Sequence, residues 1–202
     1  LLMFLGGLLD GLVQASTGAF RAQQADLIVY SSSSRDSLVR SRIEPEVRQR
    51  VERTDGVEAT GGLDSVQLGG HLDGRDPRDL LAVVLFGYEL APGGLPDTPP
   101  PAGEVYADDA LQAEGVEEGT TIALGPARTP VEVVGFVSDT RFNGQGSLWG
   151  SPETWATVAD ANRPDITLAD DVVQALVVRT TKGAPVAEVA DRIDRGTDGA
   201  TS

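Results

Sequence analysis

Residues that could perform hydrolytic chemistry are few in this chain. A catalytic triad needs a base, and the one histidine, His71, lies in a predicted glycine-rich turn. Ser147 follows a glycine, but its motif lacks the second glycine of a nucleophile elbow. The chain has no cysteine, which excludes thiol catalysis, disulfide bonds and cysteine-ligated zinc. We therefore expect no hydrolytic active site.

The paired acidic residues do not have the spacing of a catalytic or metal site. Asp139-Thr140 resembles an aspartic-protease dipeptide, but Arg141 stands where a small residue is needed, and the chain has no second copy. Asp108-Asp109 and Asp170-Asp171 lack the spacing of a calcium loop. No phosphate-binding glycine motif lies between a predicted strand and a helix. We expect no catalytic, cofactor-binding or metal-ligating residues here.

The charge of the chain excludes two classes of partner. Its 202 residues carry 31 acidic and 16 basic side chains, a formal net charge of -15. Nucleic acids and anionic lipid surfaces are bound through lysine and arginine, so an acidic chain repels both. The length is enough for one domain or two small ones with a real hydrophobic core.

The first residues form an apolar stretch that the rest of the sequence does not explain. Leu1 to Val13 contains no basic residue, and the first one in the given sequence is Arg21. It is too short to cross a bilayer and lacks the positive start of a secretory signal. We interpret residues 1–20 as the outer end of a transmembrane helix. The alternative is an ordinary amphipathic helix, because its leucines recur at helical spacing.

Strands and helices alternate along the first part of the chain. An apolar strand is expected over residues 26–30, buried on both faces, and Pro45 begins a helix over residues 46–53. A strand follows over residues 57–68, with an interruption at Gly61-Gly62. Residues 80–88 form a second strand that is apolar on both faces.

The middle of the chain has the pattern of a small β-rich unit. After a proline-rich loop over residues 91–103, a strand restarts at 104–106, a short helix runs from an Asp108 N-cap to Glu114, and residues 120–136 form a hairpin. Residues 139–150 are expected to be a loop that carries Phe142, Leu148 and Trp149. These three side chains either fold back onto the body or form a partner-contact patch.

The last part returns to helices and an apolar strand. Ser151-Pro152 begins a helix, residues 172–178 form a strand, and residues 186–194 form an amphipathic helix before a polar tail. We expect the strands at 26–30 and 172–178 to share one sheet. Residues 21–79 and 151–202 then form a discontinuous lobe, with residues 80–150 as an inserted β-rich lobe.

The order of these motifs resembles the extracytoplasmic domain of FtsX-like or MacB-like ABC transporter permeases. The resemblance covers most of the chain, from about Leu1 to Arg195. Its motifs are Ala25-Asp26-Leu27-Ile28-Val29, Asp55-Gly56-Val57, Leu85-Phe86-Gly87-Tyr88, Gly103-Glu104-Val105-Tyr106-Ala107-Asp108 and Val131-Glu132-Val133-Val134-Gly135-Phe136-Val137. It implies an α+β fold, with a discontinuous α/β lobe on a mixed sheet and an inserted β-rich subdomain.

The resemblance also implies a function without catalysis. Such a domain lies on the extracytoplasmic face of the cell membrane and transmits ATP-driven motion to a cargo or partner, which for this family is a lipid, peptide, lipoprotein or cell-wall protein. ATP would bind a separate cytoplasmic ABC ATPase, and a second permease copy is a further expected partner. The alternative is a stand-alone secreted or surface-anchored protein-binding module.

Overall fold

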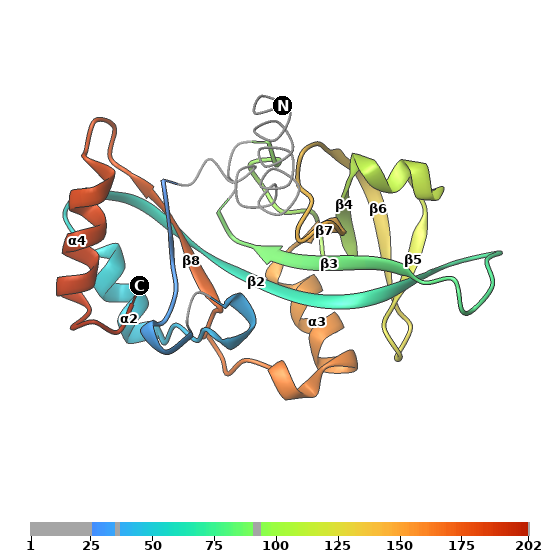
Figure 1. Ribbon diagram of the computed structural model, residues 1–202, viewed down its shortest axis with the longest axis horizontal. Helices are drawn as coiled ribbons and strands as arrows, with labels where there is room; N and C mark the ends of the chain where they lie inside the picture. Colours follow the sequence, from blue (N-terminus) through green and yellow to red (C-terminus); the bar gives the residue numbers. More distant parts are fainter. Residues whose placement is uncertain (1–25, 35–36, 91–93, 202) are drawn as a thin grey trace, which may run out of the picture.

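One mixed eight-stranded sheet organises the computed structural model, which describes residues 26–34, 37–90 and 94–201. Helices cover parts of this sheet, so the fold is α+β, as the sequence predicts (Figure 1). The strands are β1 (Leu27–Val29), β2 (Val57–Leu72), β3 (Leu81–Tyr88), β4 (Glu104–Asp108), β5 (Thr121–Leu124), β6 (Thr129–Val137), β7 (Gly146–Gly150) and β8 (Ala175–Thr180). The α-helices are α2 (Pro45–Glu52), α3 (Pro152–Asn162) and α4 (Val186–Gly196), and the 3-10 helices are η1 (Ser32–Ser34), η2 (Leu38–Arg40), η3 (Asp109–Glu114) and η4 (Pro164–Ile166).

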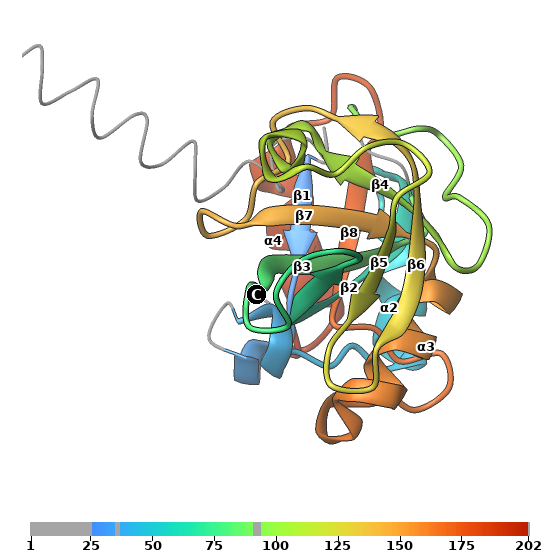
Figure 2. The ribbon, with the colours of Figure 1, turned by 90° about the vertical axis from the view of Figure 1, so that its right-hand side faces the viewer.

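Six of the strands close into a barrel. The sheet order is β1-β8-β2-β3-β7-β4-β6-β5, and β5 pairs back onto β2 through residues 70–72. Gly70 pairs with Leu81 of β3 and with Leu124 of β5, so these two strands lie on opposite edges of β2. The ring is therefore β2-β3-β7-β4-β6-β5. Figure 2 views the molecule from the barrel end.

β2 belongs to both ends of the molecule. Its first part, residues 57–63, pairs with β8, and its later part, residues 63–70, pairs with β3. In Figure 1 it crosses the molecule from α2 and α4 to the far end of the barrel. The strand has 16 residues, which corresponds to roughly 50 Å of extended backbone.

Three apolar clusters fill the spaces between these elements. The barrel interior holds Leu85 and Leu148 together with Trp155 and Val158 of α3. A second cluster on the other side of the same strands includes Phe86, Tyr88 and Trp149, and it extends to Ala175 and Val177 of β8. The third lies between β1, β8 and the helices α2 and α4, with Val51, Leu176 and Ile193 buried in it.

Several local predictions are confirmed. β1 pairs antiparallel with β8, so the strands near residues 27 and 177 share one sheet. The Ser151 hydroxyl accepts a hydrogen bond from the Thr154 backbone N–H at 3.2 Å and caps α3. Asp108 caps η3, which ends at Gly115 with a φ of 80°, although this helix is of the 3-10 type. The predicted hairpin is β5–β6.

Three predictions about the sheet are wrong. β2 is not interrupted at Gly61-Gly62, because the absent side chains admit close approach of the chain after β3: a Cβ at Gly61 would lie 2.5 Å from the backbone nitrogen of Leu90. His71 lies in β2, opposite Ala123, and not in a turn. The predicted loop at 139–150 ends in β7, which is a central strand between β3 and β4.

Two expectations from the sequence stay untested by this fold: the membrane-helix end and the division into two lobes. The predicted membrane-helix end at residues 1–20 lies outside the described residues. Within residues 26–34, 37–90 and 94–201, no helix is long and apolar enough to cross a membrane. The division into a discontinuous lobe, 21–79 with 151–202, and an inserted lobe, 80–150, stays a prediction.

Candidate functional site

The strand junction is the part of β2 where the barrel meets the β1–β8 end of the sheet. We define the junction by Gly62 and Asp64 of β2 and by three residues that contact them or each other there: Glu89 after β3, Gln174 before β8 and Arg48 of α2. Leu63 pairs with Tyr88 of β3 on one edge and with Ala175 of β8 on the other, so both ends of the sheet meet here. Polar side chains make the connections that backbone pairing leaves open.

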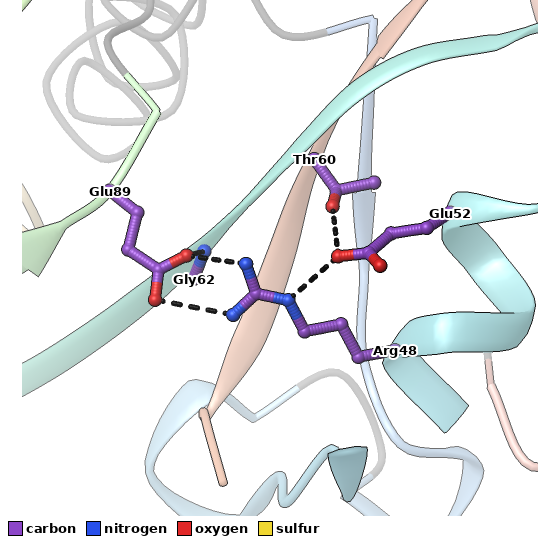
Figure 3. A network of polar contacts seen from close by, with 5 residues as sticks. All are labelled: Arg48, Glu52, Thr60, Gly62 and Glu89. Carbon is purple, nitrogen blue, oxygen red and sulfur yellow. Dashed lines mark hydrogen bonds and ion pairs between the residues drawn. The ribbon is translucent and has the colours of Figure 1, made fainter. Parts of the chain in front are cut away.

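Glu89 holds three elements together at this junction (Figure 3). It directly follows β3, and its carboxylate accepts the Gly62 backbone N–H of β2 at 2.8 Å. The Arg48 guanidinium from α2 donates to both carboxylate oxygens, at 3.2 Å and 2.7 Å. Arg48 also donates to Glu52 at 2.9 Å, and Thr60 donates to that same oxygen at 3.1 Å. α2 is thus tied to β2 and to the end of β3.

The pKa values of this ion pair follow from its contacts. Burial by itself raises the pKa of Glu89, but the hydrogen bonds from Arg48 and Gly62 outweigh it and the pKa is lowered overall. The hydrogen bond to Glu89 raises the pKa of Arg48, against the opposing effect of burial. Both side chains therefore stay charged across the ordinary pH range.

On the opposite edge of β2, Gln174 replaces a missing strand. The Ser65 backbone N–H donates to Gln174 Oε1 at 2.9 Å, and Gln174 Nε2 donates to the Ser65 carbonyl at 3.1 Å. The side-chain amide therefore makes the two bonds that a neighbouring peptide group would make. The Gln174 backbone N–H donates to Asp64 Oδ1 at 2.7 Å.

Asp64 is the perturbed ionisable group of this junction. Asp64 is only 5% exposed. Burial raises the pKa of Asp64 to about 7, while the hydrogen bond from Gln174 lowers it. Glu89 raises that pKa further, and Arg42 and Arg48 lower it. Sequence reasoning missed Asp64, Glu89 and Arg48 because their partners are far away along the chain.

A second buried network explains Ser147 and Asp108. The Trp149 indole N–H donates to Ser147 Oγ at 2.7 Å, Ser147 donates to Thr140 at 2.8 Å, and Thr140 donates to Asp108 Oδ2 at 2.7 Å. Ser147 is fully buried and its hydroxyl is bonded to Thr140 and Trp149, so it supports the β6–β7 connection. Arg141 lies beside it, with Nε 3.7 Å from Asp108 Oδ1.

Of the two alternatives for Phe142, Leu148 and Trp149, folding back onto the body holds for Leu148 and Trp149, so neither of these can form a partner-contact patch. Leu148 and Trp149 are both 0% exposed, because β7 is a central strand with apolar clusters on either side. The Trp149 ring stacks on Phe86 with centroids 4.4 Å apart. Phe142 is half-buried and meets Phe86 edge to face at 5.5 Å. A partner contact by Phe142 stays a prediction.

A groove of about 360 Å³ lies beside η3 and the β6–β7 loop. Its lining residues include exposed Leu80 and the two arginines Arg75 and Arg141. Arg75 is within 3.7 Å of Asp79 and 3.9 Å of Glu114, and Arg141 adjoins Asp108. The positive charges of the groove are thus balanced by carboxylates of the same chain.

The other acidic residues named from the sequence are not brought together. Asp139 is exposed with a φ of 57°, and Asp170 and Asp171 are exposed before β8. Within the part of the chain that the structure describes, no three histidine or acidic side chains gather in a way that could hold a metal ion.

Comparison with known proteins gives the same fold. The extracellular domain of the noncanonical ABC-type transporter YknZ from Gram-positive bacteria superposes with a TM-score of 0.55 at 13% identity, covering 87% of this chain and 97% of that one. The periplasmic region of MacB from Actinobacillus actinomycetemcomitans has a TM-score of 0.55 at 12% identity, covering 86% of this chain and 84% of that one. No curated protein matches the sequence.

The sequence itself matches a family over nearly its whole length. The family described as MacB-like periplasmic core domain aligns with residues 1–195. This range contains the apolar first residues, the barrel strands and the β1–β8 end of the sheet. The chain therefore belongs to the MacB-like periplasmic core domain family.

Proposed function

We propose that this chain is the extracytoplasmic domain of an ABC transporter permease and that it transmits motion from the membrane to a cargo or partner outside it. The membership in the MacB-like periplasmic core domain family supports this role. So does the fold shared with the extracellular domain of YknZ and the periplasmic region of MacB. The domain itself would be non-enzymatic, located at the cell membrane on its extracytoplasmic face.

The observation that carries the proposal is the continuity of β2. The same strand pairs with β8 at one end and closes the barrel at the other. A displacement applied to the β1–β8 end must therefore move the barrel, since packed cores and hydrogen-bonded strands resist internal deformation. Glu89 and Arg48 connect α2 to the same strand and so stiffen the connection.

The first and last described residues both belong to the β1–β8 end of the sheet, because Asp26 directly precedes β1 and Thr201 pairs with a residue just after β1. Ser31, which follows β1, pairs with Thr201 near the end of the chain, and the Ser32 backbone N–H donates to the Ala200 carbonyl at 2.9 Å. Motion of the segments before β1 and after Thr201 would therefore reach the same part of the domain.

The partners follow from this role and are part of the proposal. A cytoplasmic ABC ATPase would bind ATP and act through the membrane region, and a second permease copy would complete the transporter. The cargo or partner would be a lipid, a peptide, a lipoprotein or a cell-wall protein.

A linker insertion in the full-length permease tests the transmission. A flexible glycine linker at Ser16 should leave ATP hydrolysis nearly intact and abolish transport or partner activation, because a soft connection cannot deliver a displacement. The control is the same linker at Gly74, which lies in the exposed turn after β2, where a Cβ would meet no atom within 4 Å. Full coupled activity with the linker at Ser16 would refute the proposal.

A further inference from the structure

The junction contains a buried carboxyl, that of Asp64, directly after the last residue of β2 that pairs with β8. β2 pairs with β8 as far as Leu63 and with β5 from Gly70, both on the edge opposite β3. Between these positions, on that same edge, Asp64 and Ser65 are hydrogen-bonded to Gln174, through bonds of 2.7, 2.9 and 3.1 Å. We call this contact between residues 64–65 and Gln174 the seam.

The charges that surround Asp64 do not neutralise it. One carboxylate oxygen accepts the Gln174 N–H. Arg48, from α2, has its guanidinium committed to both oxygens of Glu89. Arg42, which precedes α2, donates to the carbonyls of Val39 and Ser41 at 2.9 and 2.7 Å. Glu89, after β3, adds a second negative charge. A negative Asp64 is therefore a buried charge that is only partly compensated.

We propose that Asp64 is a proton switch: the protonated carboxyl keeps the seam closed, and the ionised carboxylate favours an open seam that loosens the barrel from the β1–β8 end. Opening admits water to the carboxylate, which relieves the cost of its burial. The pH of the surrounding medium then sets how stiffly β2 joins the two ends. The inference rests on the seam alone and holds whether or not the domain serves a transporter.

The size of the effect follows from proton linkage. The pKa of Asp64 is about 7 in the closed domain, and a hydrated carboxyl in the open seam returns to about 4. The opening equilibrium should therefore increase about fiftyfold between pH 5 and pH 7 and change little above pH 8. The closed seam is favoured at low pH, since the proton stabilises the closed form.

Amide hydrogen exchange on the isolated domain tests the switch. We expect the exchange protection of Ser65 and Gln174, after division by the intrinsic rates, to fall about fiftyfold from pH 5 to pH 7. Asp64→Asn should remove this pH dependence. The matched control, Asp79→Asn, changes an exposed carboxylate in the turn before β3 and should keep the wild-type profile.

Three results would overturn the proposal. The first is a carboxyl NMR titration of the wild-type domain in which Asp64 has its midpoint near 4. This titration needs no variant, so it tests the switch even if Asp64→Asn does not fold. The second is an unchanged pH dependence of seam protection in a folded Asp64→Asn variant. The third is an equal loss of protection at Val133 and Val105 in the β4–β6 pair, because that result means global and not local opening.

Discussion

Arg48 and Glu89 are 41 residues apart in the sequence and form a two-pronged ion pair, with nitrogen–oxygen distances of 3.2 and 2.7 Å. The pair joins α2 to the end of β3, and Glu89 also accepts the backbone N–H of Gly62 in β2. Bidentate pairs of this geometry are stronger than ordinary surface ion pairs because two aligned bonds form at once. The side chains remain 25% and 35% exposed, so solvent weakens the interaction.

A double-mutant cycle should measure this coupling. Arg48→Ala and Glu89→Gln are expected to interact by about 1 kcal/mol in the free energy of unfolding at neutral pH. The pKa of Glu89 is lower in the folded domain than in the unfolded chain. The coupling is therefore complete at pH values above the unfolded pKa and is lost as the pH falls through the folded pKa. Urea unfolding of the four proteins checks both statements.

The exposed pair Arg163–Asp165 provides the control for that cycle. It is also two-pronged, with Nε and Nη2 donating at 2.9 and 2.8 Å, but it joins residues two apart in the chain. Arg163→Ala should leave the unfolding midpoint unchanged. If Arg48→Ala and Arg163→Ala lose the same amount of unfolding free energy, the Arg48–Glu89 pair contributes nothing beyond a surface contact.

The stability of the whole domain should also depend on Asp64. Its pKa is raised to about 7 by burial, whereas the unfolded chain has about 4. The protonated carboxyl therefore stabilises the folded domain; this stabilisation is complete below the unfolded pKa and is lost as the pH rises through the folded pKa. Wild type should therefore lose about 2.5 kcal/mol relative to Asp64→Asn between pH 5 and pH 8. Parallel pH profiles of unfolding free energy for the two proteins would contradict this.

Gly61 should not tolerate a side chain. A Cβ there would lie 2.5 Å from the Leu90 nitrogen and 3.0 Å from its Cα, which are backbone atoms that cannot rotate away. Gly61→Ala is expected to cost about 2–4 kcal/mol of unfolding free energy because β2 and the segment after β3 must separate. Chemical denaturation measures it.

Gly135 in β6 is the matched control for Gly61. A Cβ at Gly135 would meet only the Tyr106 ring, at 3.4 and 3.5 Å, which is ordinary contact. Gly135→Ala should leave stability within about 0.5 kcal/mol of wild type or raise it slightly. A Gly61→Ala variant as stable as Gly135→Ala would show that the close approach is not needed.

The buried hydroxyl chain should be required for stability. Ser147→Ala removes the acceptor of the Trp149 indole N–H, which lies in the interior at 2.7 Å from Ser147 Oγ. An unpaired buried donor costs about 1–3 kcal/mol, so we expect a loss of that size in thermal or urea unfolding. Ser138→Ala, at an exposed position of the same connection, should have no measurable effect. If the two variants melt alike, the chain of bonds does not support this region.

The sequence alone determined the features whose causes are local. The Ser151 cap and the Gly115 ending of η3 depend on a few consecutive residues, and both form as predicted. The apolar strands near residues 27 and 177 were recognisable because strands that are buried on both faces are apolar at every position. β8 is buried in this way, whereas Leu27 and Ile28 of the edge strand β1 are only half-buried. The family could be recognised from the ordered series of such motifs, and the match over residues 1–195 confirms it.

One further strand could have been found from a local signal. Phe142 and Gln145 exchange backbone hydrogen bonds of 3.1 and 2.9 Å around Asn143-Gly144, whose φ values are 50° and 76°. Asn-Gly is the preferred pair for such a two-residue turn, since both positions need a positive φ. This dipeptide indicated that the predicted loop at 139–150 contains a tight turn before β7.

Tertiary structure alone decided the barrel and the junction. Gly61-Gly62 ends a strand in most contexts, and here it continues one because Leu90 fills the space that side chains would occupy. Asp64 and Gln174 are 110 residues apart, and β5 meets β2 only after the chain has passed through β3 and β4. Such contacts depend on burial and on backbone groups brought together from distant segments, which residue type and spacing do not encode locally.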